Sequence, residues 1–139
     1  MVTNPAIYRL ISLQVAAKQG TIMGYLTTHV LDTANGCPGE GIKITLYRVE
    51  DGGLFEVKTA ITNADGRVDG PLLEEADFGT GIYQLEFAAG DYFRARGTEL
   101  NDPAFLDVVP IRFGIAEEGA HYHVPLLISP YGYSTYRGS

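Results

Sequence analysis

The sequence predicts a mainly β protein in which short antiparallel strands form a sandwich. Two segments, 42–47 and 83–87, alternate apolar and polar residues with a period of two, as half-buried strands do. Turn-forming pairs containing glycine, asparagine, aspartate or proline recur between such segments. Several short strands at this spacing are typical of a β-sandwich. The length of 139 residues fits a single domain.

The expected elements follow from these signals in chain order. Strands are expected near 25–32, 42–47, 54–62, 83–87, 106–114, 121–129 and 131–137. The turn signals between them are Asn35-Gly36, Asp51-Gly52-Gly53, Asp65-Gly66, Gly79 to Gly81 and Ser129-Pro130. One helical interruption is expected around 91–96, after Gly90. The chain has no internal repeat and no low-complexity segment that would predict another architecture.

Residues 1–22 differ from the rest of the chain because they carry no strand pattern. We expect them to form an N-terminal extension, disordered or with a short helix from Ile7 to Lys18, before a domain at 23–139. Met23-Gly24 looks like a second start, so a mis-assigned start codon would explain the extension. We therefore expect residues 1–22 to be dispensable for folding and activity.

Composition excludes several classes of protein. The net charge of −7 disfavours a nucleic-acid partner, which would need a basic face. The single cysteine, Cys37, excludes an intrachain disulfide and requires no oxidising compartment. No stretch approaches the roughly 20 apolar residues of a membrane span, and the N-terminus lacks a signal-peptide pattern. We expect a cytoplasmic protein with no membrane partner.

The three histidines lie on predicted strands, on the face opposite the expected core. His29 alternates with Leu26 and Val30, and His121 and His123 alternate with a second apolar set. That set is Tyr122, Val124, Leu126 and Ile128. The histidine face also carries apolar residues, namely Leu31, Pro125 and Leu127. A second copy of the chain would bury such a partly apolar face, which predicts that the histidines lie at a subunit interface.

The residues by themselves leave other interpretations open. The histidines are also compatible with hydrogen-bonded surface or core positions, or with a zinc site in which His29 joins the His121-x-His123 pair. Arg67, after the Asp65-Gly66 turn, is compatible with an exposed turn residue. The aromatic-rich tail at 131–139 is compatible with an ordinary terminal strand. Motifs of covalent hydrolases and of phosphate-binding loops are absent.

Three ordered motifs resemble the 5-hydroxyisourate hydrolases, the enzymatic relatives of transthyretin. They are Leu26-Thr27-Thr28-His29-Val30-Leu31-Asp32-Thr33 with Gly36 and Pro38, then Asn63-Ala64-Asp65-Gly66-Arg67, then the tail from His121 to Ser139. The segment from Phe87 to Phe93 is also similar to the family. The terminal Tyr136-Arg137-Gly138-Ser139 is the family's most specific mark and separates the hydrolases from the hormone carriers. The resemblance covers residues 25–139.

The resemblance implies a transthyretin-like β-sandwich of two four-stranded sheets with one short helix. It implies a homotetramer, a dimer of dimers, with active sites in a channel between the dimers. The implied catalytic residues are His29, Arg67, His123 and Ser139, and the implied substrate-binding residues are Tyr136, Arg137 and Gly138. Arg67 is chosen over Arg48, and His123 over His121, by position within the motifs.

The reaction that the resemblance implies is hydrolysis of 5-hydroxyisourate to 2-oxo-4-hydroxy-4-carboxy-5-ureidoimidazoline in urate catabolism. Water would attack a ring carbonyl with histidine as the base and arginine holding developing negative charge. No metal or organic cofactor is expected. The rival functions are a transthyretin-like carrier of a small aromatic ligand and a metal-binding or structural sandwich. A carrier would lack the polar histidine and arginine groups, and a metal-binding protein would take up zinc without hydrolysis.

Overall fold

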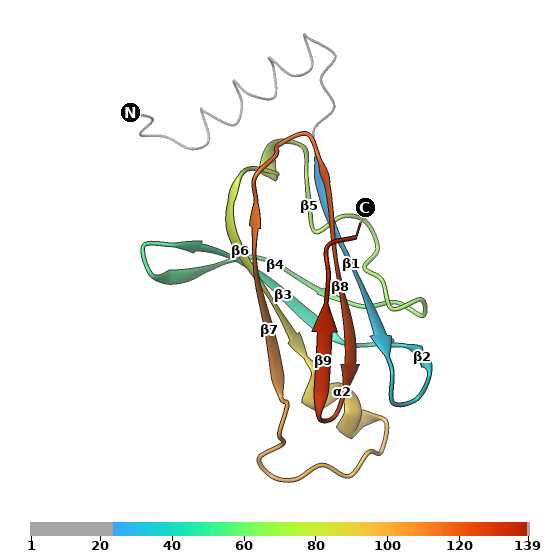
Figure 1. Cartoon of the computed structure of the whole chain (residues 1–139). Helices are drawn as coiled ribbons and strands as arrows, with labels where there is room; N and C mark the ends of the chain where they lie inside the picture. The colour runs from blue at the N-terminus through green and yellow to red at the C-terminus, as the bar shows by residue number, and fades with distance from the viewer. Residues whose placement is uncertain (1–23, 139) are drawn as a thin grey trace.

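The computed structural model describes residues 24–138 and shows two β-sheets packed face to face (Figure 1). The predicted extension at 1–22, Met23 and Ser139 lie outside the described residues. The first sheet has the order β2-β1-β8-β9, with the short β5 paired to β1, and the second has the order β4-β3-β6-β7. The predicted two-sheet sandwich with one short α-helix is confirmed in this part of the chain. The second sheet has the four strands that were predicted, and the first has five because β5 also pairs with β1.

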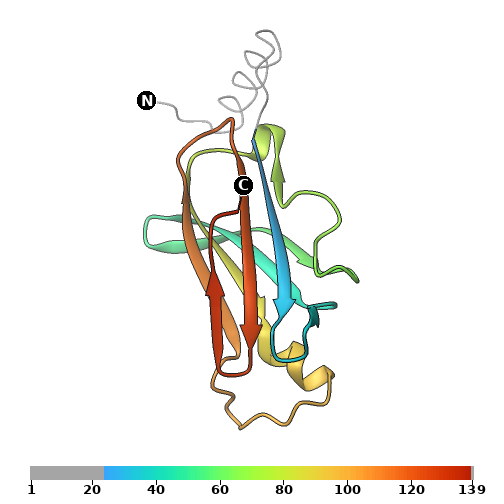
Figure 2. The same cartoon turned by 45° about the vertical axis from the view of Figure 1, so that its right-hand side comes forward.

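The strands of the first sheet are β1 (Tyr25–Asp32), β2 (Cys37–Pro38), β5 (Leu73–Glu74), β8 (His121–Ser129) and β9 (Gly132–Thr135). Those of the second sheet are β3 (Lys43–Glu50), β4 (Gly53–Ile61), β6 (Gly81–Ala88) and β7 (Val108–Ile115). The 3-10 helix η1 (Glu75–Asp77) follows β5, and α2 (Ala89–Ala95) follows β6. Figure 2 shows β1, β8 and β9 side by side, with α2 at one end of the sandwich.

One pairing differs from the wholly antiparallel prediction. β1 and β8 run parallel, with Thr27 opposite His123 and Val30 opposite Leu126. Parallel neighbours need a long crossover connection, and here the whole second sheet lies between the two strands in sequence. The helix also begins earlier than expected, so Gly90 is inside α2 rather than before it.

The core lies between the sheets and follows the predicted alternation. Leu26 and Val30 of β1 are fully buried, as are Leu126 and Ile128 of β8. The second sheet contributes Ile44, Leu46, Tyr83, Leu85, Phe87, Val109 and Ile111. Burial of these side chains stabilises the sandwich by roughly 1.5–3 kcal/mol each. The same alternation turns the histidines of β1 and β8 away from the core.

A buried carboxylate joins the first sheet to α2. Asp32, at the end of β1, is 1% exposed and accepts hydrogen bonds from the backbone N–H groups of Ala34 and Asn35. The Asn35 amide and the Tyr92 hydroxyl also donate to it, at 2.7 and 2.8 Å. Burial raises the pKa of Asp32, but these hydrogen bonds outweigh burial and hold the pKa below its usual value. Burial and the Asp32 charge raise the pKa of Tyr92. The pair therefore consists of an ionised acceptor and a neutral donor.

No helix among residues 24–138 is long and apolar enough to cross a membrane.

We expect Tyr92→Phe to lower the free energy of unfolding by about 1.5–3 kcal/mol, the usual contribution of a hydrogen bond to a charged group. The pKa of Asp32 is depressed in the folded chain, so its contribution is present above the unfolded pKa of about 3.9 and is lost as pH falls through the folded pKa. The difference between the two proteins should therefore shrink in acid. Urea unfolding at pH 7 and pH 3 measures it, with Tyr131→Phe, a change at an exposed tyrosine, as the control. An equal difference at both pH values would contradict this account.

Candidate active site

The parallel register of β1 and β8 brings polar side chains together on the face away from the core. Tyr25 lies opposite His121 and Thr27 opposite His123. Side chains two positions apart on a strand share a face, so all four belong to one surface. The ring of His121 stacks on Tyr25, with centroids 4.1 Å apart and an angle of 18° between the planes.

The Asp65-Gly66-Arg67 turn docks on the other side of β1. The Val30 N–H donates to the Gly66 carbonyl at 2.8 Å. The backbones of Arg67 and His29 form an isolated antiparallel β-bridge. Gly66 has φ of +76°, and an added Cβ would collide with the Val30 carbonyl oxygen. Only glycine permits both the left-handed backbone and this close approach. The motif therefore works as a unit that carries Arg67 to the histidine face.

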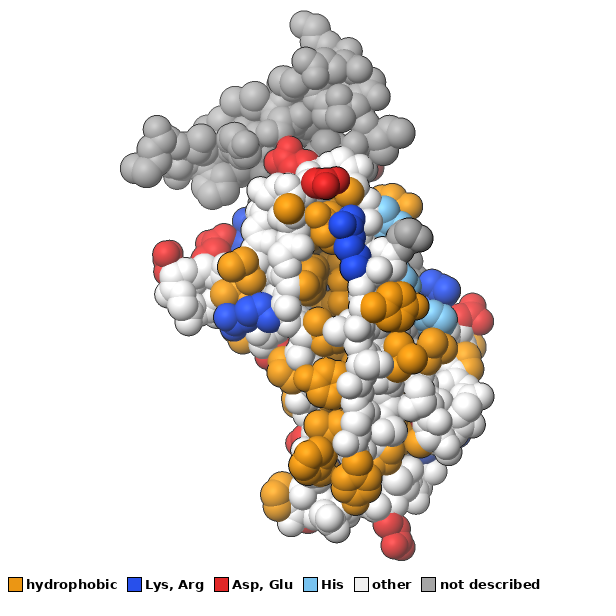
Figure 3. Space-filling view, viewed as in Figure 1, with side chains coloured by type: hydrophobic (Ala, Val, Ile, Leu, Met, Phe, Trp, Pro, Cys, Tyr) orange, Lys and Arg blue, Asp and Glu red, His pale blue; other side chains and the backbone are white. Residues whose placement is uncertain are grey.

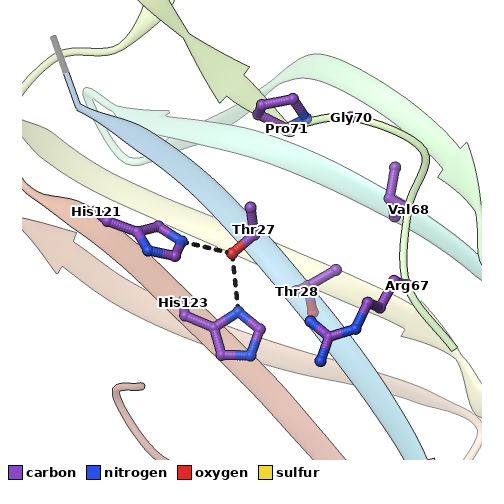
Figure 4. A pocket seen from close by; sticks show the side chains of 8 residues that line it. All are labelled: Thr27, Thr28, Arg67, Val68, Gly70, Pro71, His121 and His123. Atoms are coloured by element: carbon purple, nitrogen blue, oxygen red, sulfur yellow. Dashed lines mark hydrogen bonds between the residues drawn. The ribbon is translucent and has the colours of Figure 1, made fainter. Parts of the chain in front are cut away.

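Arg67 and His123 line one cavity of about 470 Å³ (Figure 4). The full lining is Thr27, Thr28, Arg67, Val68, Gly70, Pro71, His121 and His123. Figure 4 shows the Arg67 guanidinium entering from the loop, with His121 and His123 across from it on β8. The structure thus brings together two of the predicted catalytic residues from separate segments of the chain.

His29 lies beside this cavity rather than in its lining. Its Nε2 is 2.9 Å from the Asp65 carbonyl oxygen. A carbonyl oxygen only accepts hydrogen bonds, so Nε2 of His29 carries a proton and donates. The bond ties β1 to the turn that holds Arg67, and in a neutral ring it leaves the lone pair on Nδ1.

His123 has the environment expected of a neutral base. Its Nδ1 is 2.8 Å from the Thr27 hydroxyl oxygen. Burial lowers the pKa of His123, and the positive charge of Arg67, followed by the neighbouring His121 and His29, lowers it further. His123 is therefore largely neutral near pH 7 and able to take a proton, while Arg67 stays charged.

The tail packs against His123 through one residue of the predicted tetrapeptide. The Gly138 N–H donates to the His123 carbonyl at 2.8 Å. An added Cβ at Gly138 would lie 2.6 Å from Cδ2 of the His123 ring. Arg137 instead lies over the Tyr122 ring, 4.0 Å from its centroid, and Tyr136 is 58% exposed. Neither of these two residues lines the cavity.

Sequence reasoning missed Thr27 and gave His121 a minor place. Both line the cavity, and the Thr27 hydroxyl oxygen is also 2.8 Å from Nε2 of His121. Alternation along β1 places Thr27 on the histidine face, but only the register with β8 shows that it meets both rings. Within residues 24–138, no three His, Cys, Asp or Glu side chains are placed to hold a metal ion together.

Comparisons with known proteins point to one family. The sequence model of the HIUase/Transthyretin family matches residues 26–138. A 5-hydroxyisourate hydrolase 2 of Rhizobium meliloti (strain 1021) is 66% identical over 116 residues, covering 84% of this chain and 97% of the relative.

Two solved structures have the same architecture. The 5-hydroxyisourate hydrolase of Klebsiella pneumoniae matches with a TM-score of 0.70 and 37% identity, covering 84% of this chain and 100% of that one. An (S)-allantoin synthase matches with a TM-score of 0.81 and 47% identity over 86% of this chain. The chain spans only 45% of that synthase.

We expect Gly138→Ala to push the His123 ring toward the open cavity, because the new methyl group would overlap the ring. Burial is the first cause of the lowered pKa of His123, so the displaced ring should titrate closer to the ordinary value of about 6.5. An NMR titration of the histidine ring resonances measures this change. Gly132→Ala is the matched control, since its nearest neighbour would be 3.8 Å away. Identical His123 titration in all three proteins would refute the packing role of Gly138.

Proposed function

We infer from its membership of the HIUase/Transthyretin family, which the match over residues 26–138 establishes, that this chain hydrolyses 5-hydroxyisourate in urate catabolism. The product is 2-oxo-4-hydroxy-4-carboxy-5-ureidoimidazoline. The observation that carries the proposal is that Arg67 and His123, from two separate matching motifs, face one cavity. We assign the domain to residues 23–139, with 1–22 as an extension.

His123 is proposed as the general base. The reaction needs a group that removes a proton from water as the water attacks a ring carbonyl. The lowered pKa of His123 supports this role because a neutral imidazole must be available near pH 7. The water proton goes to Nε2 of His123 as the water oxygen bonds to the carbonyl carbon and the carbonyl π electrons move onto its oxygen. When the C=O bond re-forms, the ring C–N bond breaks, and the leaving nitrogen takes the proton from His123.

Arg67 is proposed to hold the substrate and the developing oxyanion. Its guanidinium is a permanent cation with a planar set of donors, which suits an oxygen-rich planar ring. Charge on the carbonyl oxygen grows as water adds, so the attraction is strongest in the transition state. Its position across the cavity from the histidines supports this division of roles.

His29 is proposed as the second catalytic histidine, acting from beside the cavity. Its bond to the Asp65 carbonyl steadies the turn that carries Arg67. In a neutral ring that bond leaves Nδ1 to accept or pass on a proton. His29 also contributes to the lowered pKa of His123, so removing it should affect the base as well as the turn.

The tail residues are proposed to complete the site. Gly138 permits the close approach to His123. Tyr136 and Arg137 do not line the cavity of the single chain, and their proposed contact with the substrate rests on the family motif. Ser139 lies outside the described residues, and its proposed catalytic role, binding a histidine or the substrate through its hydroxyl, rests on the family motif. These steps use protein groups alone.

We further propose a homotetramer, a dimer of dimers, in which a second copy covers the histidine face. Leu31 and Leu127 are register partners on that face and are only half-buried in the single chain, whereas Pro125 is already buried. Figure 3 shows hydrophobic side chains gathered beside the histidines. A cytoplasmic location also stays a prediction.

The test of function is to follow the decay of freshly generated 5-hydroxyisourate by ultraviolet absorbance. The chain should accelerate it, and His123→Ala should reduce turnover by about 100- to 10,000-fold, the usual cost of losing a general base. His29→Ala and Arg67→Ala should also reduce turnover strongly without unfolding the chain, whereas His121→Ala should have a smaller effect. A wild-type chain that leaves the rate of spontaneous decay unchanged would refute the proposed hydrolase function. Equal losses in His121→Ala and His123→Ala would overturn the choice of base.

Light scattering at micromolar concentration tests the assembly, and we expect four times the mass of a single chain. Leu127→Lys should lower that mass, because it places a charge on the face proposed to be covered. Leu54→Lys is the control, since Leu54 is 41% exposed on β4 in the other sheet. A wild-type monomer that retains activity would refute the proposal that a second copy covers the histidine face.

A further inference from the structure

One threonine hydroxyl lies between the two histidines of β8. The Thr27 hydroxyl oxygen is 2.8 Å from Nε2 of His121 and 2.8 Å from Nδ1 of His123 (Figure 4). Both are ordinary hydrogen-bond lengths. The three side chains are partly buried. This threonine is therefore a shared partner of both rings.

The number of protons on that hydroxyl restricts the two rings. A hydroxyl donates one hydrogen bond and accepts up to two, so at least one of the two ring nitrogens must donate to it. The arrangement in which both nitrogens present lone pairs is excluded. The protonation of His121 Nε2 and of His123 Nδ1 is thus coupled through one oxygen atom.

The restriction matters because an imidazole presents its lone pair on only one nitrogen when neutral. If Thr27 donated to Nδ1 of His123, the proton of that ring would be on Nε2, which could not then accept one. If Thr27 accepts from Nδ1–H, Nε2 keeps the lone pair that a base needs. The threonine proton is then free to bond with Nε2 of His121.

We propose that Thr27 is a positioning residue that holds His123 in the tautomer with Nδ1 protonated, with His121 as the acceptor of the threonine proton. The proposal rests on the function given above, in which His123 is the base. Leaving a partly buried hydroxyl proton without an acceptor would cost free energy, which favours His121 as its partner. Stacking on Tyr25 orients the His121 ring, so the acceptor is itself fixed.

The same arrangement suits His123 after it has taken a proton. The imidazolium carries N–H groups at both nitrogens, so Nδ1–H continues to donate to Thr27 without any rearrangement. The hydroxyl, already donating to His121, presents its oxygen lone pair to the new charge. Thr27 therefore serves both protonation states of the base with one geometry, which limits reorganisation during the reaction.

The experiment combines ring ¹⁵N NMR of the whole protein with steady-state kinetics on 5-hydroxyisourate. In the wild type, neutral His123 should carry its proton on Nδ1. Thr27→Val removes the hydroxyl but keeps the shape of the side chain, and it should release this preference. The value of kcat should fall by about 10- to 100-fold, as when the partner that orients a functional histidine is lost. KM should change by less than about twofold, because substrate contacts remain.

Three further variants make the outcome specific. Thr27→Ser restores a hydroxyl and should recover the Nδ1–H tautomer and most of kcat. Thr33→Val is the matched control, since it removes a threonine hydroxyl that bonds β8 at the Ile128 carbonyl, at the other end of β1. His121→Phe keeps a ring stacked on Tyr25 but removes the acceptor, so neutral His123 should shift toward its Nε2–H form even if Thr27→Val does not fold.

Neutral wild-type His123 with its proton on Nε2 would overturn the proposal. So would an unchanged tautomer and unchanged kcat in Thr27→Val, or an equal loss of kcat in Thr33→Val. Failure of the proposed function has a different signature, because a wild type without hydrolytic activity still reports its tautomers by NMR.

Discussion

Parallel pairing of β1 with β8 is the interaction on which the candidate site depends. It sets Thr27 opposite His123 and Tyr25 opposite His121, and on the other face it buries Leu26 between the sheets. Because successive side chains alternate between faces, a slip of one residue would turn either strand's polar set into the core. The hydrophobic core and the site are therefore two consequences of one register. The burial that stabilises the sandwich also holds the histidines in place.

Close backbone approach at two glycines brings the remaining parts of the site to this pair of strands. Gly66 lets the turn before Arg67 lie against the carbonyl of Val30, and Gly138 lets the tail lie against the ring of His123. Both segments also form isolated backbone β-bridges with the strands that carry the histidines, the turn at His29 of β1 and the tail at His123 of β8. Backbone hydrogen bonds hold the turn and the tail against β1 and β8. These two segments therefore have less conformational freedom than if only flexible side chains attached them.

The electrostatics of the cavity give two nitrogen-containing side chains different charge states, a cationic guanidinium and a neutral imidazole. Arg67 carries a permanent positive charge, while burial and then that positive charge lower the pKa of His123. The arginine is therefore the cation and the histidine the neutral base. At the other end of β1 the outcome is the opposite of that at His123. There, hydrogen bonds keep the buried carboxylate of Asp32 ionised, next to a neutral Tyr92. Each group's charge state follows from its immediate neighbours.

The sequence by itself determined the strands, the face to which each side chain belongs and the family motifs, because these depend on neighbours within a few positions. Alternation placed His29, His121 and His123 opposite the core, and the glycine of the Asp-Gly-Arg turn marked a tight loop. The roles of Tyr136, Arg137 and Ser139 stay predictions from the family motif. Only the tertiary structure decided that β1 and β8 run parallel, that Arg67 and His123 share a cavity, and that Thr27 joins two histidines. Thr27 is 94 and 96 positions from its two partners, and no local pattern encodes the register that brings residues so far apart into contact.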